Sequence, residues 1–125
     1  MSNAHAAADA HAQEDIARHK QIAEAHQAAA ECVQSVGKLA DCETRLQAAC
    51  KGIAVGQHCG LRAGAGDYRG DAKRHVADHR TMVRAHSNAA ACLSAGKTHG
   101  ACEKALKEDC GGVGVGKYCG MRHAH

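Results

Sequence analysis

The sequence contains no phenylalanine, no tryptophan and no proline, and it has only two tyrosines among its 125 residues. Alanine is by far the commonest of its hydrophobic residues. An interior built from such small side chains buries little apolar area per residue. A chain of this size therefore needs disulfides, a bound metal or a partner subunit to support its core. A homodimer is accordingly an alternative to a core closed within one chain.

Several classes of function are disfavoured by what is absent. No apolar run approaches the roughly 20 residues that a membrane-spanning helix needs, so we expect no membrane span. The basic residues are scattered and have no aromatic neighbours on which bases stack, which argues against a nucleic-acid partner. Carboxylates and serines form no acid–base or nucleophile arrangement. We therefore expect a protein that is not an enzyme.

Eight cysteines and eleven histidines are the main signal in the composition. An even number of cysteines in a small chain with a weak core is typical of an oxidising compartment. We therefore expect a periplasmic or secreted protein.

The chain is an internal duplication with an offset of 60 residues. Between 11–62 and 71–122, 18 of 52 aligned positions are identical without a gap. We interpret residues 1–125 as a single domain built of two repeats, 5–62 and 71–122, joined by the glycine-containing linker 63–70. The repeated cysteines are Cys32, Cys42, Cys50 and Cys59 in the first half and Cys92, Cys102, Cys110 and Cys119 in the second.

Each repeat has the pattern of a helical hairpin. Its long first segment places small or apolar residues and histidines at alternating intervals of four and three, which predicts the buried seam of a packed helix. A shorter helical segment and a glycine-rich stretch follow. We therefore expect an all-α protein in which two duplicated αα-hairpins form a disulfide-stapled four-helix bundle. The seam positions are 12, 16, 19, 23, 26, 30 and 33, and 72, 76, 79, 83, 86, 90 and 93.

The cysteines are candidates for staples across these hairpins. Cys32 lies about as far before the predicted turn as Cys42 lies after it, so the two face each other and can form a disulfide, as can Cys92 and Cys102. Cys50 can close onto Cys59, and Cys110 onto Cys119, across the glycine-rich stretches. Four cysteines per repeat allow three connectivities, and thiolate ligation of a soft ion such as Cu(I) or Zn(II) is a further alternative.

Histidines on the seam indicate either a hydrogen-bonded polar core or a metal site. His75 and Met82 extend the seam stripe in the second repeat, and Met121 begins a histidine-rich tail. Imidazole and thioether donors together favour copper, with zinc as an alternative ion. The predicted metal ligands are His19, His26, His75, His79, Met82, His86, Met121, His123 and His125.

Two resemblances support these expectations. The segments CETRLQAACKGI (42–53) and CEKALKEDCGGV (102–113) share the pattern C-x7-C-x-G-[IV], which resembles exported bacterial cysteine-rich repeat proteins of about 60-residue period. That resemblance implies a helical, exported, disulfide-bonded protein. In size, helix count and richness in Cys, His and Met, the chain also resembles small bacterial copper-binding four-helix bundles, which implies a metal ion as ligand.

Together these patterns predict an exported binding protein for a soft transition metal, copper first, that uses core histidines assisted by methionine and cysteine. The alternative is a disulfide-stapled structural or protein-interaction module whose histidines only pack the core and which holds no metal.

Overall fold

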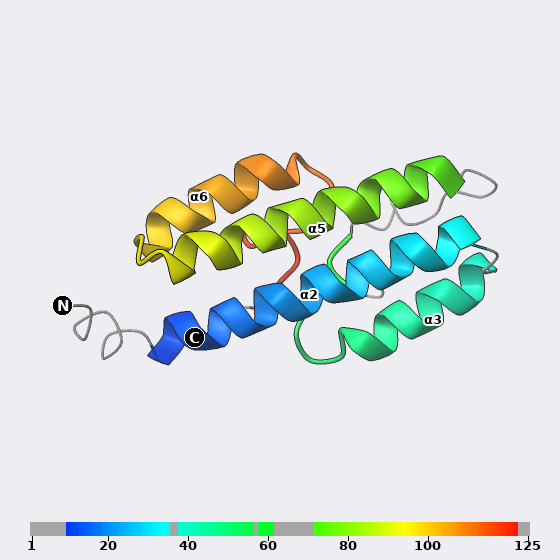
Figure 1. Cartoon of the computed structure of the whole chain (residues 1–125), viewed down its shortest axis with the longest axis horizontal. Helices are drawn as coiled ribbons and strands as arrows, with labels where there is room; N and C mark the ends of the chain where they lie inside the picture. The colour runs from blue at the N-terminus through cyan, green and yellow to red at the C-terminus, as the bar shows by residue number, and fades with distance from the viewer. Residues whose placement is uncertain (1–9, 36–37, 57, 62–71, 123–125) are drawn as a thin grey trace.

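The computed structural model describes residues 10–35, 38–56, 58–61 and 72–122, which contain four α-helices (Figure 1). The first hairpin joins α2 (Ala10–Ser35) to α3 (Leu39–Ala49), and the second joins α5 (Ala72–Ser94) to α6 (His99–Cys110). The predicted all-α fold of two disulfide-stapled helical hairpins is confirmed. The predicted linker 63–70 lies outside the described residues.

The two long helices form the centre of the molecule. α2 and α5 run antiparallel, with α3 packed on α2 and α6 packed on α5 (Figure 1). The seam histidines lie at the α2–α5 contact, as the four-and-three pattern predicts. No helix in the described ranges is both long enough and apolar enough to cross a membrane.

Local sequence explains where the second helix of the second hairpin begins and ends. The hydroxyl of Thr98 accepts a hydrogen bond from the backbone N–H of Ala101 at 3.2 Å, which caps the start of α6. Gly111 follows the last turn with φ of 57°, the left-handed conformation that ends many helices.

All eight cysteines form disulfides within their own repeat. Both pairs predicted across the hairpin turns are present, and so are both pairs across the glycine-rich loops. No cysteine is free, so thiolate assistance to a metal is wrong for the oxidised protein. The disulfides are Cys32–Cys42, Cys50–Cys59, Cys92–Cys102 and Cys110–Cys119.

The glycine-rich loops that follow α3 and α6 cross each other. Val55 donates its backbone N–H to the carbonyl of Gly120 at 2.8 Å, and Val115 donates to the carbonyl of Gly60 at the same distance. The crossing is so close that a Cβ on Gly120 would overlap the Cα of Gly60. Only glycine fits at this crossing.

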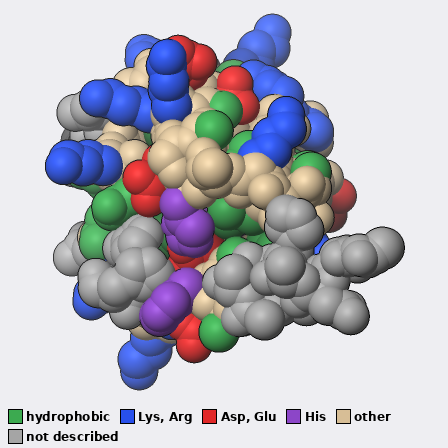
Figure 2. All heavy atoms as spheres, turned by 90° about the vertical axis from the view of Figure 1, so that its left-hand side faces the viewer, with side chains coloured by type: hydrophobic (Ala, Val, Ile, Leu, Met, Phe, Trp, Pro, Cys, Tyr) green, Lys and Arg blue, Asp and Glu red, His purple; other side chains and the backbone are tan. Residues whose placement is uncertain are grey.

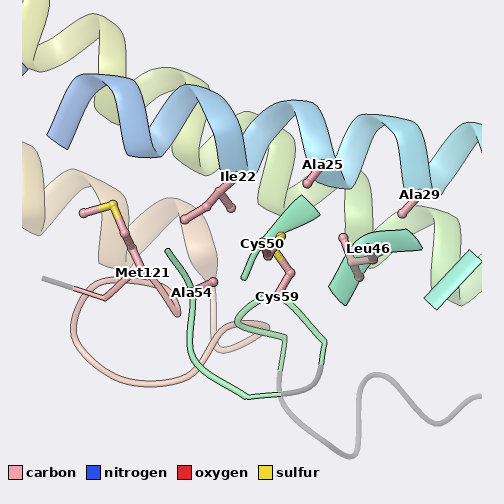
Figure 3. Close-up of a cluster of buried hydrophobic side chains, with 8 residues drawn as sticks. All are labelled: Ile22, Ala25, Ala29, Leu46, Cys50, Ala54, Cys59 and Met121. Carbon is pink, nitrogen blue, oxygen red and sulfur yellow. A yellow bond between two sulfur atoms is a disulfide. The ribbon is translucent and has the colours of Figure 1, made fainter. Parts of the chain in front are cut away.

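As a result, the two repeats exchange the ends of their loops. Met121, from the second repeat, packs in the core of the first hairpin beside Ile22 (Figure 3). Leu61, from the first repeat, packs in the core of the second hairpin beside Met82. The partners of each contact differ by 60 residues, so the hairpins are related by an approximate two-fold axis near the loop crossing. Each hairpin core is completed by the other repeat.

Substitution of Gly120 by alanine tests the crossing against a matched glycine. Gly116 has a similar positive φ of 76°, against 84° for Gly120, but the space that a Cβ would occupy there has no other atom within 4 Å. Both substitutions carry the left-handed backbone penalty of about 1 kcal/mol, and only Gly120→Ala adds a backbone clash. We expect Gly120→Ala to lower the free energy of unfolding by at least about 2 kcal/mol more than Gly116→Ala, measured by denaturant titration. Equal losses in the two variants would contradict the crossing.

Candidate functional site

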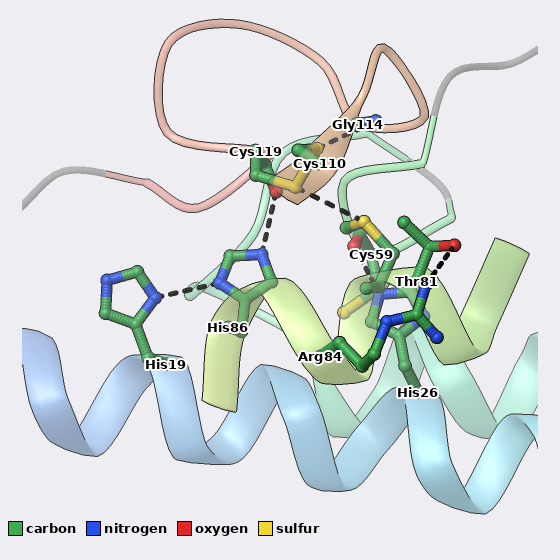
Figure 4. Close-up of a disulfide and its surroundings, with 10 residues drawn as sticks. His19, His26, Cys59, Thr81, Arg84, His86, Cys110, Gly114 and Cys119 are labelled. Carbon is green, nitrogen blue, oxygen red and sulfur yellow. Dashed lines mark hydrogen bonds between the residues drawn. A yellow bond between two sulfur atoms is a disulfide. The ribbon is translucent and has the colours of Figure 1, made fainter. Parts of the chain in front are cut away.

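Four histidines meet in two pairs between α2 and α5. Nδ1 of His19 lies 2.8 Å from Nδ1 of His86, and Nδ1 of His26 lies 2.7 Å from Nδ1 of His79. Nε2 of His26 lies 2.8 Å from the carbonyl oxygen of Cys59, and Nε2 of His86 lies 2.9 Å from that of Cys119 (Figure 4). The approximate two-fold axis relates the two arrangements.

Burial keeps the imidazoles of His26, His79 and His86 neutral at pH 7. It lowers the pKa of His26 from 6.5 to about 3, and the neighbouring His79 adds to this effect while the hydrogen bond to the Cys59 carbonyl opposes it. Burial, followed by His75 and His58, lowers the pKa of His79 to about 4. Burial also lowers the pKa of His86 to about 4, against the hydrogen bond to its carbonyl.

The carbonyl contacts fix which nitrogen of each ring carries the proton. A carbonyl oxygen only accepts, so His26 and His86 each carry their proton on Nε2 and accept at Nδ1. Their partners, His79 and His19, must then donate from Nδ1. A neutral imidazole has one proton, so Nε2 of His19 and Nε2 of His79 are lone-pair nitrogens. The network therefore turns two of the four histidines into oriented bases or ligands.

The four predicted seam ligands do not converge on one point. His19 and His26 are seven residues apart on α2, which is about 10 Å along a helix. Each belongs to a different pair, and the pairing nitrogens are used in hydrogen bonds. A single ion held by all four is therefore not the arrangement of this protein.

The predicted methionine ligands lie in the hydrophobic core. Met82 is fully buried, and its Sδ lies 3.4 Å from Sγ of the disulfide-bonded Cys119. Met121 is buried beside Ile22 (Figure 3) and also reaches the wall of a small cavity next to His19. His123 and His125 lie outside the described residues.

This cavity opens at the end of the molecule where α2 begins and α6 begins. Its volume is about 10 Å³, room for roughly one water-sized guest. Histidine and acidic side chains are grouped on this end face (Figure 2). The polar residues that line the cavity are Asp15, His19, His99, Glu103 and Tyr118.

Asp15 is the buried charge at this cavity. Only 2% of the residue is exposed, and its Oδ2 lies 3.7 Å from Nδ1 of His99, while Oδ1 lies 3.8 Å from Nη1 of Arg18. The side chain of His99 is 37% exposed. A carboxylate and two imidazoles thus surround a space of atomic size.

A second cluster occupies the location that the two-fold axis relates to this cavity. His75 takes the place of Asp15, and its ring centroid lies 6.0 Å from that of His79, one turn along α5. His58 takes the place of Tyr118, and its Nδ1 lies 2.8 Å from Oε2 of Glu43. The cluster is rich in imidazole where the cavity is rich in carboxylate.

Sequence reasoning missed Asp15, His58, His99 and Glu43. The sequence did contain a signal for Asp15. It aligns with His75 at the 60-residue offset, so a carboxylate in the first repeat stands where the second repeat has an imidazole. The other three lie off the seam, and only the fold brings them to it. Among the residues that the structure describes, no group of three or more His, Cys, Asp or Glu side chains is placed so that it could hold a metal ion.

The depressed pKa values predict loss of stability in acid. In the unfolded chain His26, His79 and His86 bind protons below about pH 6.5, whereas in the folded chain these three histidines bind protons only at about pH 4 to 3. The stabilisation is complete above pH 6.5 and falls as the pH drops toward 4, by up to about 1.4 kcal/mol per pH unit for each histidine. Denaturant titrations from pH 7 to pH 4 measure this slope.

A double variant separates this effect from general acid sensitivity. His26→Gln with His79→Gln removes one pair, so the slope should be shallower even though the variant is less stable at pH 7. An exposed-site variant, Glu24→Gln, should keep the wild-type slope. A free energy of unfolding that stays constant from pH 7 to pH 4 in the wild-type protein would contradict the neutral pairs.

Comparison with known proteins adds no relative from which a role could be transferred. Neither a protein-family model, nor a curated protein, nor a solved structure matches the chain. Its function is therefore inferred from its own residues.

Proposed function

We propose that the protein is an exported transition-metal-binding protein whose ion lies in the cavity between Asp15, His19 and His99. Copper is the first candidate ion and zinc the alternative. This proposal keeps the metal expected from the sequence but moves the site from the middle of the seam to one end of it.

The observation that carries the proposal is an ion-sized cavity with donors at suitable spacing. Two ligands of a tetrahedral ion, each about 2.0 to 2.1 Å from it, are roughly 3.3 Å apart. Oδ2 of Asp15 and Nδ1 of His99 are 3.7 Å apart at the wall of this cavity. A space of about 10 Å³ has no room for an organic ligand. Its chemistry suits a single ion.

His19 supplies the third donor in this proposal. Its Nδ1–H is held by His86, which in turn donates to the Cys119 carbonyl. Metal-binding histidines typically donate their other ring nitrogen to a fixed acceptor in this way, because the contact sets the tautomer and raises ligand basicity. The lone pair of His19 Nε2 is therefore prepared for an ion.

Side-chain motion completes the site. The half-exposed His99 can turn toward an ion that Asp15 has attracted, and Glu103 lines the same cavity. This accounts for a set of donors that surround the cavity without being assembled into a three-ligand site. The thioether of Met121 at the cavity wall favours copper over zinc, because sulfur donors prefer the softer ion.

The disulfides support the exported part of the proposal. Four disulfides in a chain with a small apolar core are typical of an oxidising compartment, such as a periplasm or the extracellular space. They also prevent the cysteines from competing for the ion.

An interaction module without metal is the second candidate function. It is favoured by the hydrogen-bonded histidine pairs, which are explained by packing alone, and by the lack of a preassembled three-donor group in the described part of the chain. Metal affinity distinguishes the two candidates.

Copper and zinc affinities should depend on Asp15 and His99. In a background with His123→Ala and His125→Ala, which removes the tail donors, Asp15→Asn and His99→Ala should each weaken binding at this site at least about tenfold. Glu24→Gln removes an exposed carboxylate from the same helix and should have no effect. Isothermal titration with the disulfides intact measures all four proteins.

Unchanged affinity in both Asp15→Asn and His99→Ala would refute the cavity site. If, in addition, the wild-type protein purified without a tag retains no metal, the interaction module becomes the better account of its function.

A further inference from the structure

The two hairpins differ where the long helix of each meets its short helix. In the second hairpin, Nδ2 of Asn88 on α5 donates to Oδ2 of Asp109 on α6 at 3.3 Å, so a polar bridge joins the two helices. The counterparts at the 60-residue offset in the first hairpin are Ala28 and Ala49, which have no polar group to form such a bridge. The contact between α2 and α3 is therefore open at a place where the duplicated fold tolerates a bridge.

A cavity of about 90 Å³ lies between α2 and α3 at these two alanines. Ala25 and Ala29 lie on the side of α2 that faces Leu46 of α3 (Figure 3). The rest of the apolar lining is Ala28, Ala49 and the disulfide between Cys32 and Cys42. Water in a cavity needs two to four polar partners, and among the described lining residues only Arg45 has a polar side chain. The interior of this cavity therefore suits an apolar guest.

Arg45 gives the cavity a cation at its solvent side. The residue is exposed, whereas its neighbours in the lining on α3, Cys42 and Leu46, are each only 2% exposed. In the described part of the chain the guanidinium of Arg45 forms no ion pair. The second hairpin has Ala105 at the corresponding position, so this charge also belongs to the first hairpin alone. A guanidinium binds a carboxylate through two parallel hydrogen bonds and balances its single charge.

We propose that this cavity binds a short-chain aliphatic carboxylate of four or five carbon atoms, whose alkyl end lies between α2 and α3 and whose carboxylate pairs with Arg45. The size follows from the volume: an engineered apolar cavity of about 150 Å³ binds benzene, so about 90 Å³ has room for roughly four carbon atoms. A guest this small should bind with a Kd on the order of 1 mM. The site shares no residue with the proposed metal site and does not depend on it.

A series of carboxylates of increasing length tests the apolar part of the site. Each methylene that enters the cavity should lower the Kd about fourfold from ethanoate to pentanoate, and heptanoate should bind no more tightly than pentanoate because the cavity is then full. The measurement is a nuclear magnetic resonance titration of the full-length, disulfide-bonded chain with labelled alanine methyl groups. The methyl signals of Ala25, Ala28, Ala29 and Ala49 should shift together as the ligand is added.

Two sets of variants separate the space from the charge. Ala28→Asn with Ala49→Asp copies the bridge of the second hairpin, which this chain already accommodates, and should weaken binding of both pentanoate and the neutral pentanamide at least about tenfold. Arg45→Gln should weaken pentanoate binding about fivefold and leave pentanamide binding unchanged. Lys104→Gln removes an exposed cation from α6 and should change neither affinity. Circular dichroism reports the folding of each variant.

The proposal is overturned if pentanoate leaves the four methyl signals in place, if the folded double variant binds pentanoate as tightly as the wild-type protein, or if Arg45→Gln has no effect on it. Shifts of the same signals when the protein alone is diluted would place a second copy of the chain in the cavity, and would also overturn the proposal.

Discussion

The crossing of the two glycine-rich loops at Gly60 and Gly120 is the constraint on which the rest of the structure depends. It allows each repeat to insert its last apolar residue into the core of the other hairpin. It also places the carbonyls of Cys59 and Cys119 against the histidines of the long helices. Those carbonyls fix the tautomers of His26 and His86. These tautomers in turn decide that His19 and His79 donate from Nδ1 and carry their lone pair on Nε2. A backbone contact between glycines thereby sets the chemistry of side chains on both helices.

A core of alanines and imidazoles is a consistent solution for a chain without large aromatic residues. Small residues let α2 and α5 approach closely, but they supply little apolar area. The paired histidines fill the contact with flat rings whose N–H groups are all hydrogen-bonded, either within the pair or to the loop carbonyls. Satisfied buried polar groups carry little penalty, whereas unsatisfied ones are costly. The disulfides provide the remaining constraint by holding each short helix and each loop to its own hairpin.

The sequence predicted the helices, the duplication and the disulfides across the hairpin turns, because each depends on local periodicity or on spacing around a turn. The seam also predicted which histidines are buried. It did not predict that His19 and His26 belong to different pairs. Their spacing of seven residues, about two helical turns, already separates the two side chains by about 10 Å along the helix. The loop exchange was not predictable, because glycine-rich segments carry no periodicity. His58 and His99 were missed for the same reason: they reach the seam only through the path of the chain in space.

The proposed cavity site would couple ion binding to the packing of the two hairpins. An ion bound at Nε2 of His19 withdraws electron density from the ring and makes its Nδ1–H a stronger donor to His86. This hydrogen bond joins α2 to α5, so an ion at His19 would strengthen the contact between the hairpins. By linkage, any change that tightens this contact raises the affinity for the ion. The histidine pairs are structural, and in the proposed cavity site one of them would also serve the ion: His86 anchors the contact, and His19 presents its lone pair.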